Sequence, residues 1–180
     1  MSTRILLFTL ISLFSGLVAH AATSQRDYLT PQEVDLVKEA QELDKRTEVF
    51  IKAAERRLLV INGTAAANAK QLKKDAERWG ELPTGSRAEL VSDIARIVDA
   101  AIDNIDNVSE HDERNPLVAK SLRRLATSVN SIMAQLKPLS AEMKSDAEIA
   151  SFEQLNEGVQ SIMEAAGKLP PEVEKKAKKN

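Results

Sequence analysis

The sequence contains no cysteine, so no disulfide can form and the fold must be stable through packing alone. Histidine is almost absent too, since the chain has only His20 and His111. A di-metal centre in a helical bundle needs Glu-x-x-His motifs, and the residue three positions before His111 is Val108. These absences exclude a di-metal enzyme of the usual form and weigh against a histidine-dependent triad. We expect His111 to lie near a helix end, where its charge would complement the helix dipole.

Aromatic residues are also few, at 3% of the chain, and neither sign of charge dominates, because the net charge at pH 7 is −2. A chain with this balance has no bulk attraction to polyanions. Its basic groups are interleaved with acids and have no aromatic residues among them for base stacking. We therefore expect no nucleic-acid partner and interpret these groups as solvated surface: Arg56-Arg57, Lys70, Lys73-Lys74 with Arg78, and Lys175–Lys179.

Long hydrophobic runs are missing except at the N-terminus, where a mostly apolar run over 5–18 follows Arg4 and precedes Ala19-His20-Ala21. A positive start, a short apolar core and a small-x-small site form the pattern of a secretory signal peptide. We predict a signal peptide over residues 1–21, cleavage before Ala22, and a secreted or periplasmic protein. No later stretch is long enough to cross a membrane, so we expect no transmembrane segment after cleavage.

The rest of the chain is rich in Ala, Leu, Glu, Lys, Gln and Arg and has no convincing period-2 strand, which predicts an all-α fold. Capping boxes and helix-starting prolines mark helix starts after Thr30, Ser86, Asn115 and Ser145. Apolar residues at spacings of three and four form four heptad-like seams, as in coiled coils. We predict an antiparallel four-helix bundle over residues 30–167, after a lead-in over 22–29 and before a disordered basic tail over 168–180.

The apolar spacing also predicts individual helices, at about 31–61, 65–79, 86–109, 116–144 and 146–167. The first is either one helix or two helices in line, with a bend near Leu43-Asp44. The second has only Leu72 and Trp79 as large apolar residues, so we expect a solvated arm. The third has a wide seam, suited to more than one neighbour. In the fourth, the seam continues through Pro138, and we predict a kink there rather than a stop.

One acidic stripe, formed by Asp99, Asp103, Asp106 and Glu110, follows helical spacing and could in principle hold a hard cation. It lies opposite the apolar seam of its helix, and neither an octahedral cage nor a glycine-bearing calcium loop is present. Charged residues are expected on the polar side of an amphipathic helix. We therefore interpret the stripe as a solvated face, and we predict no catalytic, cofactor-binding or metal-binding residue in this chain.

The stretch WGELPTGS, residues 79–86, holds the only tryptophan of the chain. Its glycine spacing resembles a phosphate-binding loop, but serine stands where that loop needs lysine and no strand precedes it. We interpret the stretch as turn residues that lead into a helix cap. A lone tryptophan beside a loop is also typical of a small binding hot spot. The sequence therefore leaves open whether Trp79 and the 80–85 loop form a contact site.

Several blocks of the sequence carry a resemblance: Asp27–Thr30, Glu39–Gln41, Leu43–Arg46, Trp79–Leu90 and Ala101–Asp106. With these blocks the chain resembles a group of uncharacterised bacterial exported helical proteins. The resemblance implies export and a helical fold. It implies no activity, ligand or catalytic residue.

These patterns favour a non-enzymatic exported module that acts through a protein partner or through self-association. Regular seams, exposed charged faces and the missing catalytic constellations support this hypothesis. The alternative is a bundle that binds a small molecule or a metal ion in the periplasm, because small residues such as Ala119, Ala126 and Gly158 lie beside the seams. Close helix packing explains those small residues equally well.

Overall fold

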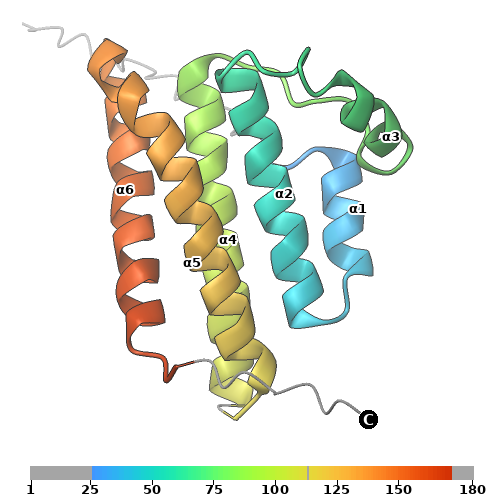
Figure 1. The fold of residues 1–180 in the computed structure, drawn as a ribbon, viewed down its shortest axis with the longest axis vertical. Helices are drawn as coiled ribbons and strands as arrows, with labels where there is room; N and C mark the ends of the chain where they lie inside the picture. Colours follow the sequence, from blue (N-terminus) through green and yellow to red (C-terminus); the bar gives the residue numbers. More distant parts are fainter. Residues whose placement is uncertain (1–25, 113, 172–180) are drawn as a thin grey trace, which may run out of the picture.

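The structure is a computed structural model that describes residues 26–112 and 114–171. Its elements, in chain order, are α1 (Pro31–Glu39), α2 (Leu43–Ile61), α3 (Ala69–Trp79), α4 (Arg87–His111), α5 (Pro116–Leu136), the 3-10 helix η1 (Lys137–Glu142) and α6 (Asp146–Gly167) (Figure 1). These residues contain no strand, so the prediction of an all-α fold is confirmed. The predicted signal peptide over 1–21 and the lysine-rich end of the tail lie outside the described residues.

The four long helices α2, α4, α5 and α6 form the bundle (Figure 1). Arg87 and Glu148, which both lie in the first turn of their helices, form an ion pair, so α4 and α6 run parallel. Asn62 and Gln135, both at helix C-terminal ends, share a hydrogen bond, so α2 and α5 are also parallel. Helices that follow one another in the bundle alternate in direction, which confirms the antiparallel four-helix bundle. Helices α4 and α5 also contact each other across the middle.

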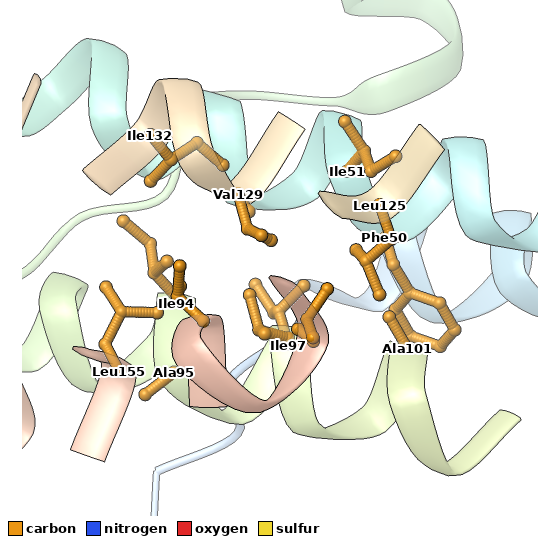
Figure 2. Packing of buried hydrophobic residues seen from close by; sticks show 14 of the residues in the cluster. Phe50, Ile51, Ile94, Ala95, Ile97, Ala101, Leu125, Val129, Ile132 and Leu155 are labelled. Carbon is orange, nitrogen blue, oxygen red and sulfur yellow. The ribbon is translucent and has the colours of Figure 1, made fainter. Parts of the chain in front are cut away.

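Helix α4 contributes the widest apolar face of the core, as its sequence predicts. It packs against α2, α5 and α6, and a helix with three neighbours must bury more than one narrow seam. Figure 2 shows how its isoleucines interdigitate with Val129, Ile132 and Leu155 of the other helices. The buried apolar residues of α4 are Leu90, Val91, Ile94, Ala95, Ile97, Val98, Ala101 and Ile105.

The predicted helix over 31–61 is two helices that fold back on each other, so both the single helix and the pair in line are wrong. Helix α1 ends at Glu39, and Ala40 takes an extended conformation. The Arg46 Nε atom donates to the Ala40 carbonyl oxygen at 2.9 Å and holds the turn. Glu33 near the start of α1 binds Arg57 near the end of α2, which makes the two helices an antiparallel hairpin (Figure 1).

Pro138 ends the α-helix instead of kinking it, which corrects the predicted helix over 116–144. Proline has no N–H for the carbonyl of Ala134, so the i to i+4 ladder cannot continue. The α-helix stops at Leu136, and the chain tightens into the 3-10 helix η1. The apolar seam does continue, because Leu139 packs against the core.

The predicted arm over 65–79 and the C-terminal end of the predicted domain also differ in detail from the expectation. Residues 65–68 form a turn, and only 69–79 is helical, as α3; α3 has no buried residue, which confirms a solvated arm. At the C-terminal end of the domain, Leu169 packs against the core, so the predicted start of the tail at 168 is too early. None of the described helices combines the length and the apolar character that a bilayer span requires.

Candidate functional site

The acidic stripe and His111 lie on the surface of α4, as predicted. Asp99, Asp103, Asp106 and Glu110 are exposed, and Asp99 accepts a hydrogen bond from Gln154 at 3.1 Å. His111 is exposed at the end of α4, with its Nδ1 atom 2.7 Å from the Asn107 carbonyl oxygen. Within the described ranges, no group of three or more His, Cys, Asp or Glu side chains is placed to hold a metal ion.

The pair Arg56-Arg57, interpreted from the sequence as solvated surface, is instead buried, and this corrects the interpretation. Each of the two side chains is only 1% exposed. The Arg57 guanidinium donates to both carboxylate oxygens of Glu33, at 2.8 Å each, and to the Ala53 and Tyr28 carbonyl oxygens at 2.8 and 2.6 Å. Such a two-pronged ion pair has the geometry that arginine favours with carboxylates.

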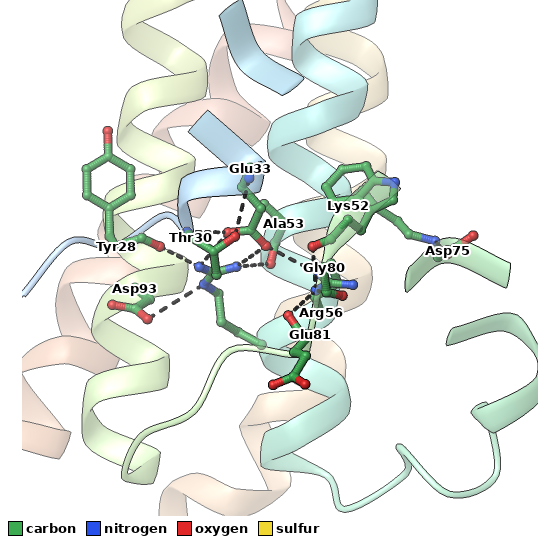
Figure 3. A network of polar contacts seen from close by, with 12 residues as sticks. Tyr28, Thr30, Glu33, Lys52, Ala53, Arg56, Asp75, Gly80, Glu81 and Asp93 are labelled. Carbon is green, nitrogen blue, oxygen red and sulfur yellow. Dashed lines mark hydrogen bonds and ion pairs between the residues drawn. The ribbon is translucent and has the colours of Figure 1, made fainter. Parts of the chain in front are cut away.

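Glu33 is the centre of this network, and it is fully buried (Figure 3). Its Oε1 atom accepts from Arg57 and also from Arg56 Nε at 3.3 Å. Its Oε2 atom accepts from Arg57 and from the backbone N–H of Thr30 at 2.9 Å, which completes the predicted capping box. One carboxylate therefore caps α1 and neutralises two buried cations, which joins α1 to α2.

A second buried carboxylate, that of Asp93 on α4, extends the network toward Arg26. Asp93 accepts from Arg26 at 2.7 Å and lies 3.6 Å from the Nε atom of Arg57. Burial raises the pKa of Asp93, and the charges of Arg26 and Arg57 oppose that rise. Burial likewise lowers the pKa of Arg56, and Glu33 opposes that change. The network thus links the lead-in, α1, α2 and α4 through charges that compensate one another.

Arg56 also explains the stretch WGELPTGS, because its guanidinium holds the backbone of that stretch. The Arg56 Nη2 atom lies 3.1, 3.2 and 2.5 Å from the carbonyl oxygens of Trp79, Gly80 and Glu81 (Figure 3). The Trp79 ring stands beside the same guanidinium, with 5.7 Å between Arg56 Cζ and the ring centroid. The stretch is therefore a connection anchored to α2, and this anchoring also fixes the position of Trp79.

Gly80 is a residue of this connection that tolerates a side chain poorly. Its φ of +65° and ψ of −165° belong to a region that only glycine adopts without strain, and an added Cβ would lie 3.0 Å from the Gln32 side chain. We expect Gly80→Ala to lower the free energy of unfolding by about 1–3 kcal/mol in urea denaturation. Gly167→Ala is the matched control: nothing lies within 4 Å of its added Cβ. It should be neutral or stabilise by up to about 1 kcal/mol, and equal losses in both variants would contradict this account.

A broad groove of about 960 Å³ opens beside Trp79, along the outer face of α2. The turn between α1 and α2 forms one end of the groove, the last residues of α3 form one side, and α5 forms the other. Trp79 is partly exposed there. The lining residues are Glu39, Ala40, Gln41, Glu42, Lys45, Glu48, Val49, Ile51, Lys52, Glu55, Arg78, Trp79, Arg124 and Ser128.

The charges of the groove fall into a paired and an unpaired set. Lys52 binds Asp75 at 2.8 Å, and Glu48 pairs with both Arg124 and Lys45. In the part of the chain that the structure describes, no cation lies within ion-pair distance of three other lining carboxylates, Glu39, Glu42 and Glu55. Among the described residues Arg78 also lines the groove without an ion pair, so the four lining glutamates face four cations, Lys45, Lys52, Arg78 and Arg124. The groove therefore offers an indole ring and three carboxylates without an ion-pair partner, which can receive positively charged groups.

The centre of the bundle offers no comparable space. The gap lined by Phe50, Ala54, Ile97 and Ala101, among others, is too small to admit a water molecule. Sequence reasoning singled out Trp79 but missed the groove and the buried network. The sequence does carry one sign of the buried network. The seam of this segment runs through positions 43, 47, 50 and 54 at spacings of four and three, and the next seam position is 57, which is an arginine.

The groove's lining contains neither histidine nor cysteine, and its only hydroxyl side chain is that of Ser128. Its other polar side chains are those of glutamates, lysines, arginines and Gln41. Comparison of the chain with family models, with curated proteins and with solved structures finds no match.

Proposed function

We propose that this protein is an exported, non-enzymatic helical-bundle module whose groove beside Trp79 binds a segment of a protein partner. The observation that carries the proposal is the position of Trp79, which Arg56 and its three carbonyl contacts hold at the side of a wide groove. A rigidly placed, partly exposed tryptophan is the residue type most enriched in binding hot spots. The predicted signal peptide over 1–21 supports export.

A small molecule or a metal ion as the ligand is the competing function. The central gap is too small for water, so a small molecule would have to bind at the surface, in the groove or in a smaller hollow such as the one of about 290 Å³ between α2 and α3. The groove extends along α2 from Glu42 to Glu55, which is about 20 Å of helix. A surface of that length fits a peptide segment better than a compact metabolite.

A photo-crosslinking experiment in the producing cells tests the proposed function. The crosslinking amino acid is placed at Ser128 in the groove and, as the control, at Glu157 on the exposed side of α6. We expect an adduct from position 128 and none from position 157. Trp79→Ala should weaken capture about 30-fold, which is the effect of a hot spot worth about 2 kcal/mol. Trp79→Phe should retain part of the capture, because it keeps an aromatic ring.

Circular dichroism and urea midpoints establish that each variant is folded before capture is compared. An adduct of twice the chain mass would identify the partner as a second copy. Equal adducts from positions 128 and 157, or capture that is indifferent to Trp79→Ala, would contradict the proposed function.

A further inference from the structure

The described chain ends close to the groove. Leu169 packs against the core, and the Pro170 carbonyl oxygen accepts a hydrogen bond from Arg123 on α5. The next residue of α5, Arg124, lines the groove. The path from Pro170 to the groove therefore only has to pass around α5, whose diameter with side chains is about 10–12 Å.

The segment that follows carries lysines, which can pair with the carboxylates of the groove that lack an ion-pair partner. After Pro171 the sequence continues EVEKKAKKN, with lysines at positions 175, 176, 178 and 179. These lysines are four to eight residues beyond Pro171, which corresponds to a reach of about 13–28 Å for an extended chain. That reach exceeds the width of α5, so the lysines can arrive at the groove.

From this placement we propose that the basic segment Lys175–Lys179 of the chain itself occupies the groove, with its ammonium groups beside Trp79 and the carboxylates that lack an ion-pair partner. The inference rests on the proposed function, because it makes the tail a competitor of the partner for the same surface. Attachment to the bundle gives the tail an effective concentration in the millimolar range, so individually weak contacts are sufficient. A partner must then displace the tail, which restricts binding to segments that fit the groove better than four lysines do.

The fluorescence of Trp79 reports on the groove directly, because the chain has no other tryptophan. Acrylamide quenching is compared between the full chain and a variant with Lys175, Lys176, Lys178 and Lys179 all replaced by glutamine. Acrylamide is neutral, so the change in charge does not itself alter its local concentration. We expect the quenching constant to rise about twofold in the variant, because a bound cation covers one of the two faces of the ring. Replacement of the same four lysines by arginine is the control. Trp79 should then stay as well protected from acrylamide as it is in the full chain.

Two further experiments test whether the tail is held by the carboxylates of the groove. Glu39→Gln combined with Glu42→Gln should expose Trp79 to the same degree as the glutamine tail, and adding the tail replacements to that variant should change nothing more. A synthetic peptide of residues 172–180 should restore protection to the glutamine-tail variant, and the effect should vanish in about 1 M salt, where the Debye length is about 3 Å.

Quenching constants that are equal in the full chain and in the glutamine-tail variant would overturn the proposal. Protection that disappears on dilution, with dimers in sedimentation velocity, would also overturn it, since the tail would then occupy the groove of a second copy. Neither result affects the crosslinking test at position 128. Failure of the tail inference is therefore distinguishable from failure of the proposed function.

Discussion

Glu33→Gln should lower the free energy of unfolding by about 3–5 kcal/mol, because it removes one partner of a fully buried ionic network. The glutamine keeps the shape of the side chain, but it loses the charge that compensates Arg56 and Arg57, and its amide N–H groups would face arginine donors. Denaturation in guanidinium chloride, followed by circular dichroism, measures the change.

The matched control for this substitution is Asp35→Asn on the same helix. Asp35 is exposed and forms only a surface pair with Lys38 at 3.6 Å. Surface pairs of this kind contribute about 0–1 kcal/mol, so the control should change stability by less than that. If Glu33→Gln cost no more than Asp35→Asn, the buried network would not depend on the charge of Glu33.

Phe50→Ala should cost about 3–5 kcal/mol, the usual range for removing a buried phenylalanine ring. Phe50 is 4% exposed and packs at the centre of the bundle, where the remaining gap is too small for water (Figure 2). The substitution would open an apolar cavity beside Ile97 and Ala101. Such a cavity stays dry and can bind benzene, so benzene should raise the melting temperature of the variant and not that of the parent protein.

Ile149→Ala on α6 is the control for the core substitution, since Ile149 is 40% exposed. A surface truncation of this kind should stay within about 0.5 kcal/mol of the parent. A loss below about 1.5 kcal/mol for Phe50→Ala would show that the ring is not closely packed, and the small central gap would then need another explanation.

The sequence predicts those parts of the fold that depend on local signals. The capping residues Thr30, Ser86 and Ser145 each accept a backbone N–H bond where their helices start. The break after Glu39 could not be predicted in the same way, because no glycine or proline marks it. Tertiary contacts produce that break, through the bond from Arg46 to the Ala40 carbonyl and the pairing of Glu33 with Arg57.

The candidate site was predictable to a smaller extent. Trp79 and its turn stand out in the sequence, but the groove forms only because α1 folds back along α2 and α5 packs on the other side. Sequence reasoning took Arg56-Arg57 for a surface feature because two adjacent arginines are usually solvated. Their burial depends on Glu33, whose partnership with them is invisible without the hairpin.

The buried network also bears on the order in which the chain assembles. Arg56 and Arg57 reach Glu33 and the 79–81 carbonyls across only 23 to 25 residues of sequence. Contacts of such short separation incur little loop-closure entropy and form early in folding. The first three helices can therefore gather as a local unit during synthesis, before α5 and α6 are available. The C-terminal helices would then close over a surface that is already partly ordered, which shortens the time that apolar seams spend exposed to aggregation.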